Sequence, residues 1–378
     1  MTTSEPQLPT HLQELQTPCL LLIDTRFRSN LARMAKHCEA SNFALRPHAK
    51  THKSGSIAKA QIDHGAIGIC CATISEAEHL ADSVNSILIT SPLALHRHVE
   101  RISALRERVA ELICVVDSPA MIPHFEKTFD ATRPLDVLVD LDPDMHRTGI
   151  EIGVKAFALA RSLYESPSFN FRGAQCYAGN IMHVESIGQR TRRSHELWER
   201  VATFKRQLEN QRIPCPIVTG GGTGTFDIDW QAGVATELQA GSYPFMDLEY
   251  MNIEWDHEGN LPFEPSLFVL TTVVSANTPG NVTTDAGLKA FSTDSVRPKI
   301  HAGIEKEATY VFKGDEHGGL VFEDATESIA IGTQMLITPP HCDPTINLYD
   351  HFTLVNEDLQ ILDTLSIDAR SGRLYRGV

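Results

Sequence analysis

The segment RPHAKTHKS, residues 46–54, places five basic or imidazole side chains within nine positions. It directly follows an apolar run, so we expect Lys50 to point into a confined space lined by other cations. A lysine in such a place loses its proton more easily, which imine formation with an aldehyde requires. Lys53 is the weaker candidate, because we expect it to enter the following helix. A surface basic patch is the alternative, and local composition does not decide between the two.

Two small turns could bind a phosphate group. The first is TGGGTG, residues 219–224, and the second is AGSY, residues 240–243, which adds a hydroxyl group. Glycines let an anion approach converging backbone N–H groups, and barrels often bind phosphate after their seventh and eighth strands. Glycine turns are also common without any ligand. The candidate phosphate contacts are Thr219, Gly221, Gly222, Thr223, Gly241, Ser242 and Tyr243.

A third candidate site is the triplet His341, Cys342 and Asp343. If this stretch is extended, alternate side chains share a face, so His341 and Asp343 point together while Cys342 points away. An imidazole and a carboxylate with waters suit Mn²⁺ or Mg²⁺, whereas a thiolate would favour Zn²⁺. A lone pair of this kind is weak evidence by itself. Asp315 and His317 could orient these ligands, or could simply belong to a turn.

The elements that must position these residues follow a regular pattern. Eight short apolar segments recur, most of them separated by stretches with helical periodicity: 43–46, 67–70, 87–90, 113–116, 136–141, 171–176, 216–219 and 237–239. Eight alternations of strand and helix predict an α/β fold with a (β/α)8 TIM-like barrel. In such barrels the active site lies at the carboxyl ends of the strands, where the lysine and glycine segments fall.

The composition changes near residue 261, where helical periodicity fades and Thr/Val-rich strand runs begin. We expect strands at 266–274, 308–312, 334–338 and 351–355. The predicted organisation is an N-terminal arm and strand over 1–24, a barrel over 25–260, and a C-terminal all-β domain over 261–378 that carries His341 and Asp343.

Charge and composition exclude several classes of partner. The formal net charge is −15, which opposes binding to nucleic acid or to an anionic membrane. No stretch approaches the roughly 20 apolar residues of a membrane span, and the polar start shows no secretory signal. The eight cysteines have no framework spacing. We therefore expect a reduced, cytoplasmic protein.

The motif LRPHAKTHK, residues 45–53, resembles the pyridoxal-phosphate lysine motif of the D-threonine aldolase and D-serine dehydratase family. The resemblance extends over nearly the whole chain, through TPCLLLID (17–24), SEA (75–77), HRTG (146–149), TGGGTG (219–224), TELQAGSY (236–243), DAG (285–287), DEHG (315–318) and HCDPTINL (341–348). It implies a fold type III enzyme, with an alanine-racemase-like barrel, a β domain and a homodimer. It also implies that Lys50 forms a Schiff base with pyridoxal 5'-phosphate.

The resemblance suggests roles for further residues. Arg147, otherwise an ordinary surface arginine, matches the arginine placed near the cofactor ring, and Tyr177 is expected to pack by that ring. A cation facing the pyridine nitrogen weakens the ring as an electron sink, which a metal could offset. In this family a divalent metal lies at the position of His341 and Asp343. His183 matches the aldolase branch, where a histidine is expected to act as base on the substrate hydroxyl.

The function implied is cleavage of D-β-hydroxy-α-amino acids, D-threonine-like or D-3-hydroxyaspartate-like, to glycine and an aldehyde. The resemblance favours the aldolase branch because that branch has His-x-Asp at the metal position, where dehydratases commonly have His-x-Cys. One alternative is a metal-dependent D-serine or D-3-hydroxyaspartate dehydratase. Another is a non-catalytic pyridoxal-phosphate carrier, against which the β domain with its metal pair argues. The expected partner is a small D-amino acid.

Overall fold

The computed structural model of the protein describes residues 10–256 and 258–370. Within these ranges the chain forms two compact units. The barrel unit contains residues 32–241, 253–256 and 368–370, and the sheet unit contains residues 10–31, 242–252 and 258–367. Each unit is built around its own sheet, so the two are described separately.

The sheet of the barrel unit contains all eight predicted strands. Its hydrogen-bonded order is β2-β10-β9-β8-β6-β5-β4-β3, with every neighbouring pair parallel. The strands are β2 (Ala44–Leu45), β3 (Ile69–Cys71), β4 (Ser86–Ile89), β5 (Glu111–Val116), β6 (Leu135–Asp142), β8 (Phe169–Cys176), β9 (Ile217–Gly220) and β10 (Glu237–Leu238). A short extra strand, β7 (Ile150–Glu151), pairs with the end of β6.

Backbone hydrogen bonds join the two ends of this sheet. The amide of Ile67 donates to the carbonyl of Leu45 at 2.9 Å, and the amide of Ala49 donates to the carbonyl of Cys70 at 2.8 Å. His48 and Cys70 form an isolated parallel bridge. The segment after β2 therefore pairs with the segment that contains β3, and the prediction of an eight-stranded barrel is confirmed.

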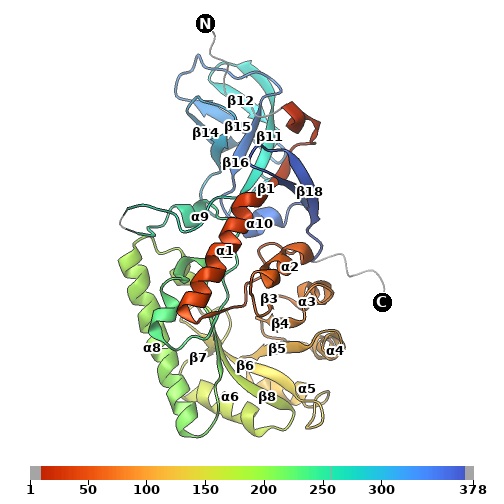
Figure 1. The fold of residues 1–378 in the computed structure, drawn as a ribbon, viewed down its shortest axis with the longest axis vertical. Coiled ribbons are helices and arrows are strands. Elements are labelled where there is room, and N and C mark those ends of the chain that lie inside the picture. Colours follow the sequence, from red (N-terminus) through yellow and green to blue (C-terminus); the bar gives the residue numbers. More distant parts are fainter. Residues whose placement is uncertain (1–9, 257, 371–378) are drawn as a thin grey trace. The chain divides into compact units, whose positions relative to one another are not determined.

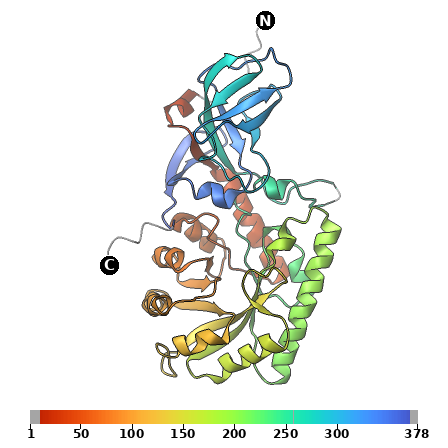
Figure 2. The ribbon, with the colours of Figure 1, turned by 180° about the vertical axis from the view of Figure 1, so that it is seen from behind.

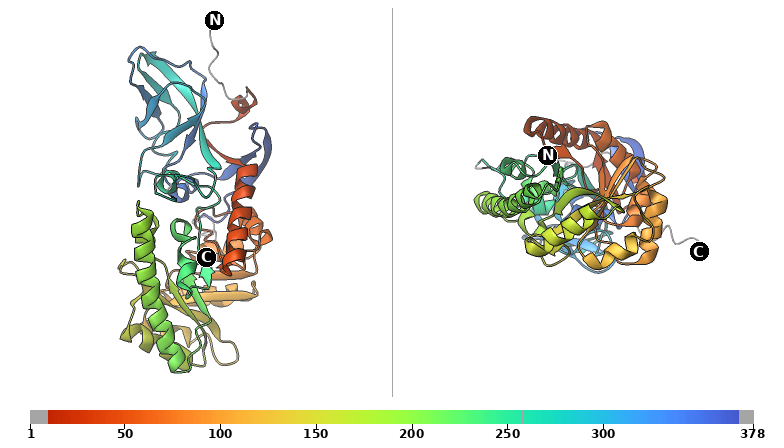
Figure 3. Two further views of the ribbon diagram at one scale, coloured as in Figure 1. Left: turned by 60° about the vertical axis from the view of Figure 1, so that its left-hand side comes forward. Right: turned by 90° about the horizontal axis from the view of Figure 1, so that it is seen from below.

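Helices connect successive strands of the barrel, and the view from below in Figure 3 shows them arranged around the strands. They are α2 (Gly55–Asp63), α3 (Ile74–Leu80), α4 (His96–Leu105), α5 (Ile122–Phe125), α6 (Val154–Glu165), α7 (Gly179–Met182) and α8 (Ile187–Asn210). Figure 1 shows α2, α3 and α4 following one another beside β3, β4 and β5. None of the helices in the described ranges has both the length and the apolar character needed to cross a membrane.

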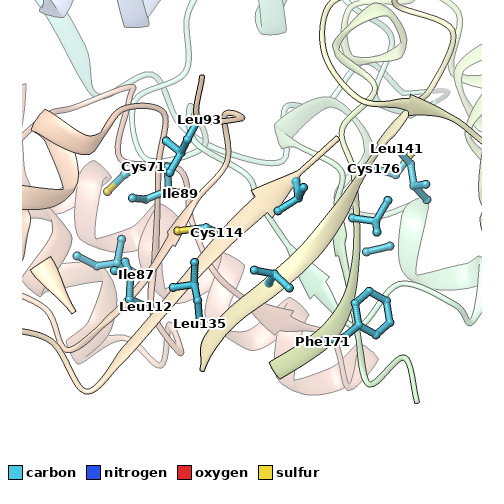
Figure 4. Close-up of a cluster of buried hydrophobic side chains, with 14 of the residues drawn as sticks. Cys71, Ile87, Ile89, Leu93, Leu112, Cys114, Leu135, Leu141, Phe171 and Cys176 are labelled. Atoms are coloured by element: carbon cyan, nitrogen blue, oxygen red, sulfur yellow. The ribbon is translucent and has the colours of Figure 1, made fainter. Parts of the chain in front are cut away.

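The strands carry apolar side chains on both faces. Cys71, Ile87 and Cys114 belong to the large cluster between strands and helices, which Figure 4 shows in close-up. Alternate residues such as Cys70 and Leu88 belong to a smaller cluster with Ile113, Val115, Leu138 and Ile217. Parallel strands buried on both faces need such continuous apolar runs. All eight cysteines are free, and seven of them are buried, so they pack as small apolar residues.

A charged network lies where several strands begin. Arg46 is 2% exposed, and its guanidinium donates to both carboxylate oxygens of Glu237, the first residue of β10, at 2.9 and 3.2 Å. It also donates to Ser86 at 2.6 Å and lies 3.4 Å from the carboxylate of Glu111. Ser86 and Glu111 are the first residues of β4 and β5. The network is therefore at the amino end of the strands, away from the candidate active site.

The sheet unit has nine strands. Its main order is β14-β15-β12-β11-β1-β17-β18, with β16 on β11 and β13 on β16. The strands are β1 (Cys19–Ile23), β11 (Leu267–Thr278), β12 (Asn281–Thr284), β13 (Lys299–Ala302), β14 (Ala308–Phe312), β15 (Gly318–Phe322), β16 (Gln334–Thr338), β17 (His351–Val355) and β18 (Ile361–Ser366). Figure 2 shows this sheet from behind, coloured cyan to blue apart from β1.

The N-terminal strand β1 lies within this sheet. It pairs antiparallel with β11 and parallel with β17, so the units are not the contiguous ranges 1–24, 25–260 and 261–378 expected from the sequence. The unit also contains the short helices α9 (Leu248–Met251) and α10 (Cys342–Ile346), and residues 10–14 form a 3-10 helix. Helix α1 (Asp24–Ser41) contains the boundary between residues 31 and 32. The first nine residues of the expected arm lie outside the described residues.

We expect Glu237→Ala to lower the free energy of unfolding of the barrel unit by about 3–5 kcal/mol, because it leaves the buried Arg46 guanidinium without its main partner. Asp63→Ala is the control, since Asp63 pairs with Lys59 at an exposed site and should contribute about 1 kcal/mol at most. All three tryptophans lie in the barrel unit, so urea unfolding followed by tryptophan fluorescence reports on it. Equal shifts in the two variants would contradict the prediction.

Candidate active site

A cavity of about 250 Å³ lies at the carboxyl end of the barrel strands. Its lining includes side chains that follow or end four different strands: His48 and Lys50 after β2, Arg147 after β6, Gln175 and Tyr177 at β8, and Gln239 after β10. The structure thus brings together the predicted lysine, arginine and tyrosine. This matches the general position of active sites in barrels of this type.

Lys50 is half-buried in this cavity, and its neighbour His48 is held in one tautomer. The backbone N–H of Lys50 donates to Nδ1 of His48 at 3.3 Å, so the proton of a neutral imidazole lies on Nε2. That Nε2 is 3.0 Å from the hydroxyl of Thr90 and donates to it. His48 can therefore line the cavity as a neutral group and need not add a second positive charge beside Lys50.

Lys53 has a different environment. Its ammonium lies 3.6 Å from the carboxylate of Glu76, and its backbone is left-handed, with φ of 49°. Helix α2 begins only at Gly55, so the expectation that Lys53 enters the helix is wrong. Lys53 is also not among the residues that line the cavity around Lys50.

Arg147 and Tyr177 are in contact within the cavity. The guanidinium carbon lies 5.3 Å from the centroid of the tyrosine ring, a distance at which a cation–π interaction forms. Arg147 follows β6, and Tyr177 comes directly after β8. Two residues that are 30 positions apart in the sequence therefore present a cation and an aromatic ring on one side of the cavity.

The glycine-rich turn after β9 depends on its glycines. Gly221 has φ of 67°, and a Cβ there would lie 2.3 Å from Oδ2 of Asp229. A Cβ on Gly224 would lie 2.0 Å from the carbonyl oxygen of Met182. Thr219 is buried in β9, where its hydroxyl accepts from the amide of Gln239 at 3.1 Å. Gly221 lines a second, much smaller cavity with Asp229 and Trp198, whereas Lys50 lines the first.

The carboxylate of Asp229 holds this turn in place through hydrogen bonds. Its carboxylate accepts from Ser194 at 2.6 Å, from the indole N–H of Trp198 at 2.9 Å, and from Thr225 at 2.5 Å. Burial raises the pKa of Asp229 from 3.8 to about 6, although these hydrogen bonds lower it. Asp229 is not among the predicted site residues, although its position five residues after the glycine-rich turn was a usable signal.

His183 is separate from the cavity lining. It is the exposed residue that ends α7, and it is not one of the side chains around Lys50. Gly241 lies in the barrel unit, where a Cβ would approach Thr51 to 2.5 Å, so that position also requires a small residue. Ser242 and Tyr243 belong to the sheet unit.

In the sheet unit, His341 and Asp343 face each other. The Nε2 atom of His341 lies 3.9 Å from Oδ2 of Asp343, a separation that two ligands of one cation at about 2.1 Å each can span. Ser242 donates to the same Oδ2 at 3.3 Å, so a predicted phosphate contact touches a predicted metal ligand. In the described parts of the chain, no group of three or more His, Cys, Asp or Glu side chains is arranged to hold a metal ion. A cation here would have two protein ligands and complete its shell with water.

His341 and Asp343 face each other, but not because of the strand-like alternation expected from the sequence. His341 is extended, with φ of −139° and ψ of 123°, but helix α10 begins at Cys342, so the predicted alternation along a strand is wrong. Cys342 is fully buried, and its thiol lies 3.6 Å from Oδ2 of Asp343. Burial, reinforced by the charges of Asp247 and Asp343, raises the pKa of this thiol well above its ordinary value. A hard cation such as Mn²⁺ or Mg²⁺ prefers oxygen to sulfur, so the carboxylate of Asp343 is the favoured partner of His341.

Two carboxylates near His341 were missed in the sequence. Nδ1 of His341 donates to Oδ2 of Asp294 at 2.8 Å and lies 3.8 Å from Oε2 of Glu249. This hydrogen bond leaves the lone pair of Nε2 directed to the side of Asp343. The backbone of Asp315 and His317 instead accepts hydrogen bonds from Lys289 and Lys313 in a turn. Asp294 is 47 residues before His341 and carries no local signal.

Comparison with known proteins identifies the family. The putative serine dehydratase domain matches residues 266–355, and the alanine racemase N-terminal domain matches residues 24–248. A D-threonine aldolase from Arthrobacter sp. is 36% identical over 361 residues, which cover 95% of this chain and 94% of the relative. The chain belongs to the D-threonine aldolase and D-serine dehydratase family. A 3-hydroxy-D-aspartate aldolase from Paracoccus denitrificans is 31% identical over 90% of this chain and 88% of the relative.

Solved structures of this family show the same fold. The D-threonine aldolase from Filomicrobium marinum superposes with a TM-score of 0.88 at 32% identity, covering 95% of this chain and 96% of that one. The D-threo-3-hydroxyaspartate dehydratase from Delftia sp. has a TM-score of 0.81 at 27% identity, covering 94% and 98%. The alanine-racemase-like fold predicted from the sequence motifs is confirmed. The family contains both aldolases and dehydratases, so the fold alone does not choose between them.

Asp229→Asn should become more stable relative to the wild type as the pH rises. Because the folded-state pKa of Asp229 is about 6, above the ordinary 3.8, its contribution to stability is present below about pH 4 and is lost as the pH rises through about 6. Asparagine does not titrate, so the difference in unfolding free energy should shift toward the variant by up to about 3 kcal/mol between pH 4 and pH 7. Urea unfolding at both pH values measures it, with exposed Asp63→Asn as control. A difference that does not change with pH would contradict the assignment.

Proposed function

We propose that this protein is a pyridoxal-phosphate- and divalent-metal-dependent aldolase that cleaves D-β-hydroxy-α-amino acids to glycine and an aldehyde. Lys50 in a cavity with Arg147 and Tyr177 supports a carbonyl-cofactor site. The observation that carries the aldolase assignment is the oxygen of Asp343 facing Nε2 of His341, whereas Cys342 is fully buried at the first position of α10. The aldolase names of the relatives agree with it.

The residues present fit both groups. Lys50 would hold the cofactor aldehyde, the turn of Gly221, Gly222 and Thr223 would receive its phosphate, and Arg147 and Tyr177 would flank its ring. His341 and Asp343 would hold the cation. Bound pyridoxal phosphate supplies a conjugated ring that accepts the electron pair of the breaking Cα–Cβ bond, and a bound divalent cation supplies positive charge that lowers the pKa of a hydroxyl group.

The chain itself supplies proton transfer and orientation. By resemblance to the aldolase branch, His183, the exposed imidazole after α7 in the segment that follows Tyr177, would take the proton of the β-hydroxyl. The His48–Thr90 hydrogen bond orients the wall of the cavity beside Lys50. A guanidinium has only hydrogen-bond donors, so a ring nitrogen that Arg147 faced would accept from it and stay unprotonated.

Dehydration is the second candidate function, and two observations favour it. The putative serine dehydratase domain matches residues 266–355. The relatives also include a D-threo-3-hydroxyaspartate dehydratase, 29% identical over 88% of this chain. In that case Lys50 would remove the α-proton and the β-hydroxyl would leave, with no cleavage of the carbon chain.

Incubation with D-threonine in the presence of pyridoxal phosphate and Mn²⁺ distinguishes the two functions. We expect equal amounts of glycine and acetaldehyde, measured by chromatography and by a coupled alcohol dehydrogenase assay. Formation of 2-oxobutanoate and ammonia would identify a dehydratase. Lys50→Ala is the control for background reaction, because it removes the amine that binds the cofactor while leaving the barrel core intact.

Asp343→Asn should weaken Mn²⁺ binding by at least about tenfold, because it removes the negative charge from one of the two proposed protein ligands. Cys342→Ala should change the affinity by less than about threefold, since Cys342 is fully buried and Mn²⁺ prefers oxygen ligands to sulfur. The EPR signal of free Mn²⁺ gives both dissociation constants without any activity assay. If Cys342→Ala lost the metal and Asp343→Asn kept it, Cys342 would be the partner of His341, and the aldolase assignment would lose its main support.

A further inference from the structure

Asp140 is a buried carboxylate directly beneath the candidate cofactor site. It lies on β6 and is 3% exposed. Its Oδ1 accepts from the amide of Gln175 at 2.8 Å, and its Oδ2 accepts from the hydroxyl of Thr148 at 2.9 Å. Gln175 and Thr148 both line the cavity around Lys50. The carboxylate is therefore one hydrogen bond away from the cavity on two sides.

These contacts belong to a polar layer that crosses the barrel. The amide nitrogen of Gln175 also donates to the carbonyl of Thr90 at 2.9 Å, and its oxygen accepts from Gln239 at 3.1 Å. Gln239 in turn donates to Thr219. Every side chain of this layer is partnered, and the only ionisable group in the chain of bonds from Thr219 to Thr148 is Asp140.

The loop that carries Arg147 is fixed by three carboxylates. Asp142 accepts from the amides of Met145 and His146 at 2.9 and 3.1 Å, and Asp117 accepts from the amide of Gly149 at 3.2 Å. His146 is left-handed, with φ of 54°, a strained conformation that such bonds must maintain. Asp140 accepts the hydrogen bond from Thr148, the residue next to Arg147, and so holds the loop at the position nearest to Arg147.

Asp140 and Arg147 also interact through their opposite charges. Burial raises the pKa of Asp140 to about 6, hydrogen bonds from Gln175 and Thr148 lower it, the charge of Asp117 raises it and the charge of Arg147 lowers it. Asp140 and Arg147 line one small cavity together with Tyr177. At neutral pH a buried anion thus lies close to the guanidinium that we place beside the cofactor ring.

We propose that Asp140 is a positioning residue for Arg147. It fixes the Arg147 loop through Thr148 and compensates the positive charge of the guanidinium, which sets the electrostatic potential at the cofactor ring. This inference rests on the proposed function in one respect: the ring beside Arg147 is that of pyridoxal phosphate.

The charge is tested with Asp140→Asn in the holoenzyme. Asparagine keeps the shape and can still bond to Gln175 and Thr148, but the negative charge is lost. The pH at which the visible absorbance of the bound cofactor titrates should then fall by about half a unit or more, because an uncompensated cation disfavours a protonated imine nitrogen nearby. Asp136→Asn is the matched control, since Asp136 lies on the same strand but pairs with Arg172 near the strand's amino end. Equal titration of wild type, Asp140→Asn and Asp136→Asn would overturn the proposed charge compensation.

The hydrogen bond from Thr148 to Asp140 is tested without cofactor, by amide hydrogen exchange of residues 145–149. Thr148→Val removes the hydroxyl that donates to Asp140 and should speed exchange in this loop by at least about threefold, as expected when a fixing hydrogen bond is lost. Thr132→Val is the control, because Thr132 also donates to an aspartate, Asp130, in another loop of the barrel unit. Unchanged exchange in Thr148→Val would overturn the positioning role. A wild-type protein with no cofactor absorbance would refute the proposed function, while the exchange result would still decide on Asp140.

Discussion

Pairing between the segment after β2 and the segment containing β3 is the constraint on which the active site depends. Strand β2 has only two residues and gains its second neighbour through the bonds of Leu45 and Ala49 to Ile67 and Cys70. Lys50 follows this pairing immediately, so its position depends on closure of the sheet. The bond from the Lys50 backbone to His48, and from His48 to Thr90, then fixes the wall of the cavity.

The interior of the barrel is layered by polarity. Arg46 and Glu237 form a charged layer where the strands begin. Leu88 and Ile113 belong to an apolar cluster. Gln175 and Gln239 form a polar layer beneath the cavity, with Asp140 as its ion. Buried polar groups of this kind are costly unless every one is paired, and once paired they specify a single arrangement. The cavity that Arg147 and Lys50 line is therefore bounded by hydrogen-bonding groups held in fixed positions.

Much of the fold could be predicted from the sequence because its signals are local. Apolar runs of strand length located all eight barrel strands, and the position of Lys50 after the first of them predicted its cavity. The helix at Cys342 could not be expected from alternation alone, although Pro344 two residues later was a signal, since proline is tolerated in a first helical turn. No local pattern in the sequence predicted that β1 pairs with β11 and β17.

The rest of the site depends on contacts between residues far apart in the chain. Asp294 reaches His341 across 47 positions, and Asp140 is one of three aspartates in the strand sequence LDVLVDLD. Nothing in the composition around either residue distinguishes it from an ordinary surface or strand aspartate. Packing of the folded chain identifies both, because burial and hydrogen-bond partners become visible only there.

The most direct test of the account is to locate the lysine that binds the cofactor. The protein would be loaded with pyridoxal phosphate, reduced with borohydride and digested, and the modified peptide identified by mass spectrometry. The account predicts the pyridoxyl group on Lys50, which lines the cavity with Arg147 and Tyr177. Modification of Lys53, which pairs with Glu76, or of no lysine in residues 46–54, would contradict it.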